Sequence, residues 1–306
     1  MAQSNVVSDV GVSAGGLGTA VASAIVQFNK GNVLGPLITM EPAPSGTNTV
    51  KFPVYTKHDV TNADYGVKNN ASGAEETIAN LTSIETTAVS VEVVRHAIRA
   101  EISDLAAHGN ADALLTNAGM QLGNDIAKEF DVIGMDLFDN FSNGVGHDDA
   151  LTWNILMDAV ATLEANDAPR PYNAVLHPLQ VYGSFGISNE FSSIAAVNGS
   201  TGAFAGLGGG VMENQFMGAG FVTNIAGIGI HTSTSVLDGA TGRKESAIFS
   251  KTAIGCGFID FGGGTFIQMA SEREEAYAKT TLVANGYFAF SELVDVHGVE
   301  IDTEVS

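Results

Sequence analysis

Histidine, the side chain most often used for acid–base and metal chemistry, occurs seven times in this sequence at scattered positions. No two histidines stand at a metal-ligand spacing such as His-Glu-x-x-His. His177 precedes Pro178 at the end of a predicted strand, where an imidazole ring commonly caps nearby backbone. We therefore expect structural roles for the whole set, which is His58, His96, His108, His147, His177, His231 and His297.

Adjacent carboxylates at Asp148 and Asp149 could form an acid pair, but they precede a predicted helix. Carboxylates in that position more often stabilise the positive end of the helix dipole. One enzymatic alternative stays open: a hydrolase or lyase whose acidic residues, Asp148 with Glu272 or Glu274, meet only in the fold. Such an enzyme would be a monomer or small oligomer with a polar cleft.

The remaining reactive features are a single cysteine and a glycine-rich segment. Cys256 cannot form an intrachain disulfide, which fits a reducing compartment, and we interpret it as a small buried hydrophobic residue. Residues 199–220 hold eight glycines, but the run 202–210 lacks the Gly-Lys-Ser/Thr ending of a phosphate loop. We expect no catalytic, cofactor-binding or metal site, and a protein that is not an enzyme.

Composition points to a protein whose surface is covered by partners. Hydrophobic residues make up 45% of the 306 residues and charged residues only 15%, while 34 acidic against 13 basic residues give a net charge of -21. That balance argues against binding nucleic acid by neutralising phosphates. The apolar stretch 17–28 is too short to cross a bilayer, so we expect no membrane partner.

A long helix over residues 110–141 is the clearest predicted element. Leu115, Leu122, Ile126, Ile133 and Leu137 recur at steps of four and seven and form one apolar stripe. Glycines at 119, 123 and 134 each cost roughly 1 kcal/mol of helix propensity, so the helix must pack against something continuous. Its outer side is predicted to carry Asp125, Lys128, Glu129, Asp131, Asp136 and Asp139.

Two predicted strands, at 50–55 and 89–93, flank a long polar excursion. Pro53 favours an edge position, and residues 56–82 are too polar for a core, which predicts a projecting two-stranded loop. Before them, the first thirty or so residues are small and rich in glycine and serine. This composition predicts either an arm that becomes ordered by lying across another subunit or a plain disordered tail.

The second half alternates helix and strand before it becomes rich in strands. Thr152 can cap a helix whose apolar side includes Leu156 and Leu163, and a buried strand at 172–178 leads into a short helix that starts at Pro178. Strands are predicted within 221–236 and at 247–252, 265–270 and 287–294.

Residues 89–106, VSVEVVRHAIRAEISDLA, contain an alternating strand followed by the Ile102-Ser103 step between Glu101 and Asp104. Residues 153–182, WNILMDAVATLEANDAPRPYNAVLHPLQVY, contain a helix, a proline-containing turn, a buried strand and a helix that starts at a proline. Both stretches resemble the major capsid proteins of tailed bacteriophages with the Hong Kong 97-type fold: the first is similar to the strand of that family that runs into its spine helix, and the second to the opening of its axial domain.

The resemblance implies an α+β fold made of an N-terminal arm, an extended β-hairpin loop, a peripheral domain with the long spine helix, and an axial domain. The implied boundaries are 1–47 for the arm, 48–95 for the extended loop, 96–148 for the peripheral domain and 149–255 for the axial domain. Residues 256–306 would supply return strands to both domains.

By the same resemblance, the chain would be a coat protein that assembles through hexamers and pentamers into an icosahedral shell enclosing double-stranded DNA. Expected partners are a separate scaffolding protein, since the chain has no room for a scaffolding segment, a portal and a decoration protein. The expected location is the virion, with assembly in the host cytoplasm. Lys57 and Lys68 lie in the loop that some relatives cross-link, but no feature marks a partner asparagine. An encapsulin-like nanocompartment shell of the same fold is the alternative, and its contents would distinguish it.

Overall fold

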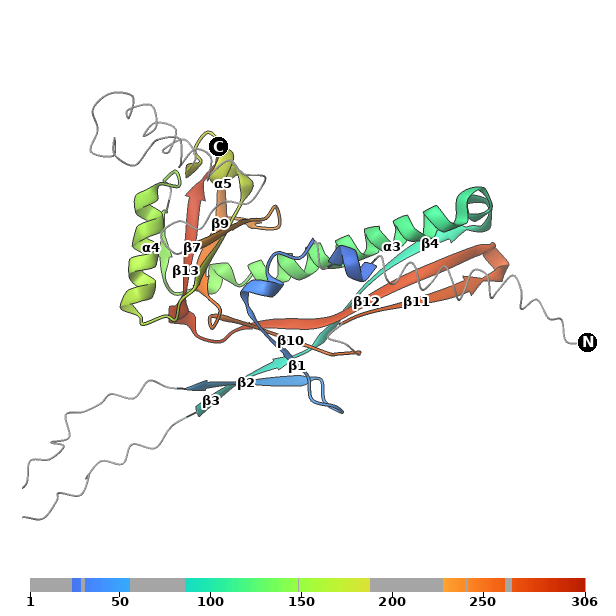
Figure 1. The fold of residues 1–306 in the computed structure, drawn as a ribbon, viewed down its shortest axis with the longest axis horizontal. Coiled ribbons are helices and arrows are strands. Elements are labelled where there is room, and N and C mark those ends of the chain that lie inside the picture. The colour runs from blue at the N-terminus through green and yellow to red at the C-terminus, as the bar shows by residue number, and fades with distance from the viewer. Residues whose placement is uncertain are drawn as a thin grey trace, which may run out of the picture.

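The computed structural model describes residues 24–28, 31–55, 86–147, 149–187, 228–239, 242–261 and 266–305, with only the backbone at 55, 86 and 104–116. Within these ranges the chain forms an elongated lobe, a compact lobe and a short two-stranded ladder (Figure 1). The α+β class predicted from the sequence is confirmed. The domain boundaries predicted from the resemblance stay predictions.

The elongated lobe is a five-stranded sheet with one long helix along it. Its strands are β1 (Thr39–Pro42), β4 (Val94–Ser103), β10 (Ile254–Phe258), β11 (Ile267–Glu274) and β12 (Lys279–Glu292). The order is β1-β10-β12-β11, and β4 also pairs antiparallel with β12. Helix α3 (Asp104–Met135) follows β4 directly and runs back beside the sheet, as Figure 1 shows.

The compact lobe holds a six-stranded sheet in the order β5-β13-β9-β6-β7, with β8 paired to β9. Its strands are β5 (Gly144–Val145), β6 (Tyr172–Leu176), β7 (Ile228–Thr232), β8 (Leu237–Asp238), β9 (Arg243–Ser250) and β13 (Gly298–Glu304). Helices α4 (Trp153–Ala165) and α5 (Pro178–Tyr182) belong to this lobe. Short 3-10 turns complete the fold: η2 (Gly35–Leu37), η3 (Phe138–Asn140), η4 (Glu275–Tyr277) and η5 (Asp295–His297).

The ladder pairs β2 (Thr49–Tyr55) with β3 (Thr86–Glu92) antiparallel, so both strands are edges and Pro53, opposite Ala88, is accommodated as expected. Its base is anchored because Val50, Phe52, Val91 and Val93 are buried against the elongated lobe. The predicted loop at 56–82 lies outside the described residues.

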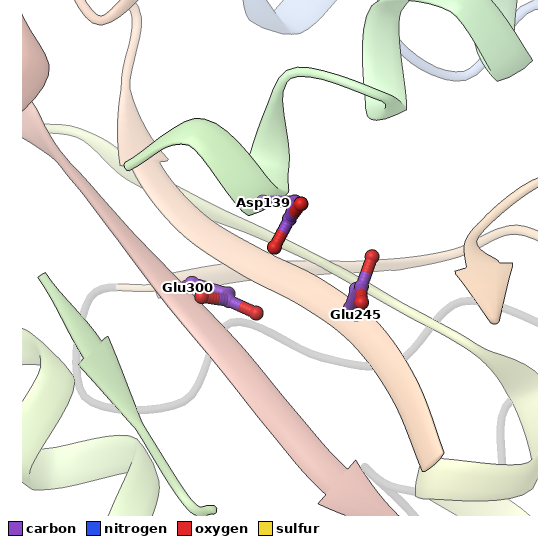
Figure 2. Close-up of side chains that lie close together, drawn as sticks. All are labelled: Asp139, Glu245 and Glu300. Atoms are coloured by element: carbon purple, nitrogen blue, oxygen red, sulfur yellow. The ribbon is translucent and has the colours of Figure 1, made fainter. Parts of the chain in front are cut away.

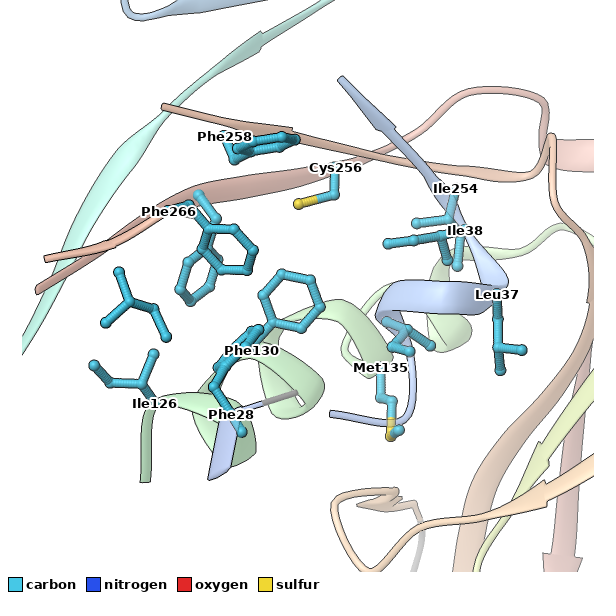
Figure 3. Close-up of a cluster of buried hydrophobic side chains, with 14 of the residues drawn as sticks. Phe28, Leu37, Ile38, Ile126, Phe130, Met135, Ile254, Cys256, Phe258 and Phe266 are labelled. Carbon is cyan, nitrogen blue, oxygen red and sulfur yellow. The ribbon is translucent and has the colours of Figure 1, made fainter. Parts of the chain in front are cut away.

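Aromatic rings fill the space between α3 and the elongated sheet (Figure 3). Phe130 of α3 is fully buried, and its ring centroid lies 5.7 Å from that of Phe28 and 5.5 Å from that of Phe266. This packing supplies the continuous support that the three helix glycines require. Of the predicted stripe, Leu122 and Ile126 are buried and Ile133 and Leu137 are half-buried.

The N-terminal segment, which we define as the described residues of 24–38, packs on the core of this same chain, within the range 1–47 that the sequence assigned to an arm. Phe28, Leu34 and Ile38 are buried in this chain's own core, and β1 then pairs parallel with β10. The segment can lie close to α3 because Gly123 has no side chain: a Cβ there would stand 2.3 Å from the carbonyl oxygen of Ala24. Residues 1–23 lie outside the described residues.

Several predicted helix and strand boundaries were wrong, because the prediction followed the apolar residues alone. Helix α3 spans Asp104–Met135 rather than 110–141, because the apolar spacing continues through the separate 3-10 turn η3. Strands β9, β11 and β12 extend into polar sequence that the apolar pattern did not cover, such as 243–246 and 271–274. Cross-strand pairing holds these polar stretches in strand form.

Candidate functional site

An acidic cluster, which we define as Asp139, Glu245 and Glu300, is the one group of three or more His, Cys, Asp or Glu side chains among the described residues whose ligand atoms lie close enough together to hold a metal ion (Figure 2). One oxygen of each carboxylate lies within 4.8 Å of those of the other two. Asp139 comes from η3, Glu245 from β9 and Glu300 from β13, and Figure 2 shows the three side chains converging.

The protonation of this cluster is shifted by burial and mutual repulsion. Partial burial, reinforced by the negative charges of Asp139 and Asp302, raises the pKa of Glu300 to about 7. The same causes, in the same order, raise the pKa of Glu245. Arg243 opposes these shifts through its positive charge. At neutral pH the cluster therefore carries part of a proton.

Asp302 lies beside the cluster and is largely buried, at 7% exposure. Its Oδ2 forms an ion pair with Nη1 of Arg243 at 2.8 Å, while no donor forms a hydrogen bond to its Oδ1. Asp302 stands directly opposite Glu245 in the β9–β13 register, and Glu300 is two residues before it on β13. The three side chains therefore share one face of the sheet.

Sequence reasoning missed this cluster because its members are 106 and 55 residues apart and none stands in a motif. Asp139 was assigned only to the outer side of the long helix. The one available signal was the alternation of Glu300, Asp302 and Glu304, which places three carboxylates on one side of a strand.

The predicted capping histidine is confirmed. His177 is the N-cap of α5, where its Nδ1 accepts a hydrogen bond from the backbone N–H of Leu179 at 3.2 Å. Gln180 completes the cap, since its Oε1 accepts from the N–H of His177 at 2.8 Å. Burial lowers the pKa of His177, which suits a neutral imidazole acceptor.

Asp149, which with Asp148 was predicted to stabilise the dipole at the start of the second helix, lies outside the first turn of that helix. Thr152 is the N-cap of α4, with its hydroxyl accepting from the N–H of Ile155, as predicted. The first turn of α4 contains no acidic residue, since Asp149 precedes the cap by three positions. Asp148 lies outside the described residues. Glu272 and Glu274 lie on β11 of the elongated lobe, and the enzymatic alternative, which pairs one of them with Asp148, stays a prediction.

Two other predicted residues have clear environments. Cys256 is fully buried among the aromatic rings of the core, and this burial raises the pKa of its thiol, so it behaves as the expected hydrophobic residue (Figure 3). Asp131 corrects the predicted acidic outer side of the helix: it is only 2% exposed, and its carboxylate accepts from the backbone N–H groups of Val33 and Leu34 at 3.0 Å.

Exposed apolar side chains gather at one end of the compact lobe. Leu179 and Tyr182 on α5 and Phe185 just after it are 45%, 54% and 40% exposed. At the far end of the elongated lobe, Tyr277 in the β11–β12 turn is 74% exposed.

An open groove of about 1040 Å³ lies between the base of the ladder and the end of β12. Its titratable lining is sparse: Glu41, Lys51 and His297, whose Nδ1 lies 2.8 Å from the hydroxyl of Thr252. With only these three titratable residues in its lining, the groove has few groups that could take part in acid–base catalysis. Among the described residues no helix is long and apolar enough to span a bilayer.

Comparison with solved structures identifies the fold. The chain is similar to the capsid of the cyanophage P-SCSP1u, with a TM-score of 0.60 and 16% identity over 90% of this chain and 89% of that one. It is similar to the capsid of Ralstonia phage GP4, with a TM-score of 0.63 and 11% identity over 88% and 87% of the two chains. The encapsulin of the holo-SrpI complex from Synechococcus elongatus PCC 7942 gives a TM-score of 0.56 and 11% identity over 89% and 88%.

No protein-family model matches the sequence, and no curated protein matches it either. The similarity is therefore one of fold, carried over nearly the whole chain in both directions.

Proposed function

The chain has the Hong Kong 97-type capsid fold, and we propose that it is a major capsid protein whose copies assemble into a closed shell around double-stranded DNA. The observation that supports this most is the extent of the match: 90% and 88% of this chain align with 89% and 87% of two phage capsid chains. We propose a structural role, and not a catalytic one, for this chain.

Assembly would use surfaces at opposite ends of the molecule. Copies would close into hexameric and pentameric rings through the compact lobe, where Leu179, Tyr182 and Phe185 are exposed. The elongated lobes would meet between rings, near Tyr277. Each contact can be modest, since closure of the shell makes many contacts act together.

The ladder of β2 and β3 would project the loop at 56–82 over a neighbouring copy. Its base is fixed to the elongated lobe by buried Val50 and Phe52, so the direction in which the two strands leave is determined by the fold. A loop held in this way adds a second attachment between neighbouring copies.

The net charge of -21 suits a container for DNA, because acidic walls repel phosphates and let a genome slide. We extend the proposal to the partners that such a shell needs: a separate scaffolding protein, a portal and a decoration protein. The assembled protein would reside in the virion and be built in the host cytoplasm.

A nanocompartment shell is the second candidate, and the similarity to the encapsulin of the holo-SrpI complex supports it. The contents of the particles separate the two functions. Particles isolated from the source cells would be treated with nuclease and protease, opened, and assayed for DNA and for enclosed protein. Protected double-stranded DNA supports the capsid; an enclosed enzyme without DNA contradicts it and supports the nanocompartment.

A further inference from the structure

The acidic cluster joins two parts of the molecule that the sheets keep separate. Asp139 is in η3, four residues after the end of α3, while Glu245 and Glu300 are on adjacent strands of the compact lobe. Their oxygens lie within 4.8 Å of one another, a spacing at which like charges repel strongly (Figure 2).

Charges around the cluster leave it strongly negative. Asp136 adds to the repulsion at Glu245, and Asp302 adds to it at both glutamates. Arg243 is the single cation that acts on both glutamates, and it is also engaged with Asp302 Oδ2. Five carboxylates thus face one guanidinium.

A second feature, separate from the cluster itself, points to a missing positive ligand. Asp302 is 7% exposed, and its Oδ1 has no hydrogen-bond donor. A buried carboxylate oxygen without a partner is costly, and native proteins seldom leave one unsatisfied. This oxygen belongs to a residue on the same sheet face as Glu245 and Glu300, directly opposite Glu245.

We propose that Asp139, Glu245 and Glu300, with Asp302 behind them, form a binding site for Ca²⁺. The ligands are all carboxylate oxygens, the donors preferred by hard cations, and no histidine or cysteine belongs to the group. Ca²⁺ accepts irregular arrangements of six to eight oxygens, whereas Mg²⁺ requires near-ideal octahedral geometry. Water would complete the coordination.

Bound Ca²⁺ would tie the end of the long helix to the compact sheet and so fix the angle between the two lobes. This inference concerns the folded chain and does not depend on the proposed function.

The test is isothermal titration of the EDTA-treated full-length protein with CaCl₂ at pH 8, together with its thermal unfolding midpoint. We expect saturable binding at one site per chain, and a midpoint raised by at least about 3 °C at a Ca²⁺ concentration one hundred times the Kd. The double variant Glu245→Gln/Glu300→Gln should lose both effects.

The matched control is Glu272→Gln/Glu274→Gln on β11, which removes the same charge elsewhere and should keep both effects. If the glutamine pair does not fold, Asp139→Asn at the exposed member of the cluster replaces it and should weaken binding at least tenfold. Absence of saturable binding in the unmodified protein, or an equal response in the cluster variants, would overturn the proposal.

Discussion

Individual residues of α3 decide how the N-terminal segment lies. Asp131 accepts backbone hydrogen bonds from Val33 and Leu34, and Gly123 leaves room for the backbone of Ala24. The sequence analysis placed Asp131 on the exposed side of the helix and treated Gly123 only as a residue that lowers helix propensity. Periodicity assigns a helix face and does not reveal which distant backbone will come to that face, so these two roles could not be predicted.

Enlarging Gly123 tests this close approach. Gly123→Val would place its Cβ 2.3 Å from a backbone oxygen, so the N-terminal segment must move, and we expect a loss of about 1–3 kcal/mol in the free energy of unfolding. Urea unfolding measures it. Glu129→Ala, at an exposed position of the same helix, should stay within about 0.5 kcal/mol of the parent. Equal values for both variants would show that the segment is not packed there.

Burial gives Asp131 a pH signature. Desolvation, opposed by the backbone hydrogen bonds, raises its pKa from 3.8 to about 6. The unfolded chain therefore releases this proton first, and the contribution of Asp131 to stability falls as pH rises from about 4 to about 6. The difference between a pKa of 3.8 in the unfolded chain and about 6 in the folded chain corresponds to roughly 3 kcal/mol in the free energy of unfolding.

Asp131→Asn removes this titration. Relative to the parent, the variant should gain stability between pH 4.5 and pH 7, by about 2 kcal/mol, as measured by urea unfolding at both values. The difference between the two proteins cancels the other titrating groups. A stability difference that does not change with pH would mean that Asp131 titrates as it does in the unfolded chain.

At the scale of elements, the apolar pattern of the sequence predicted helices and strands with a buried face, and it missed a strand that is held mainly by pairing with another strand. The long helix, the Thr152 cap and the strand before Pro178 were predicted because buried side chains and caps leave local signals. Strand β13 was missed, since its alternating Glu300, Asp302 and Glu304 resemble a surface loop. Only pairing with β9, some 50 residues earlier, makes it a strand.

The ladder of β2 and β3 makes a prediction of its own. Deleting residues 60–75 should leave the far-UV circular dichroism and thermal midpoint nearly unchanged, because the anchored base lies at Val50, Phe52, Val91 and Val93. Assembly into large particles, followed by size-exclusion chromatography with light scattering, should be lost. A variant with the same length but a Gly-Ser sequence at 60–75 separates loop length from loop contacts. Unchanged assembly in the deletion would remove the loop from the interface.

A further prediction concerns the exposed apolar side chains on and just after α5. Replacing Leu179, Tyr182 and Phe185 together by serine should abolish ring formation while the chain stays folded, since all three are at least 40% exposed. Tyr277→Ser is the comparison at the other end of the molecule, and it should affect contacts between rings only. Analytical ultracentrifugation of each variant reads out the species formed. Normal rings from the triple variant would contradict the assignment of the ring contact.

At the scale of the whole molecule, the fold class was predicted from a resemblance carried by two stretches that cover 48 residues. Those stretches contain a strand running into a helix, and a capped helix followed by a buried strand, which are the local steps of this fold. Where the N-terminal segment packs, and how three distant carboxylates meet, depends on the arrangement of the two sheets. That arrangement has no local signature in the sequence.

Negative-stain electron microscopy of the freshly purified full-length protein, alone and co-expressed with a candidate scaffolding protein, shows directly whether the chain assembles into a shell. We expect closed shells or curved sheets, because the proposed contact surfaces lie at both ends of the chain. A discrete small oligomer under both conditions would contradict it.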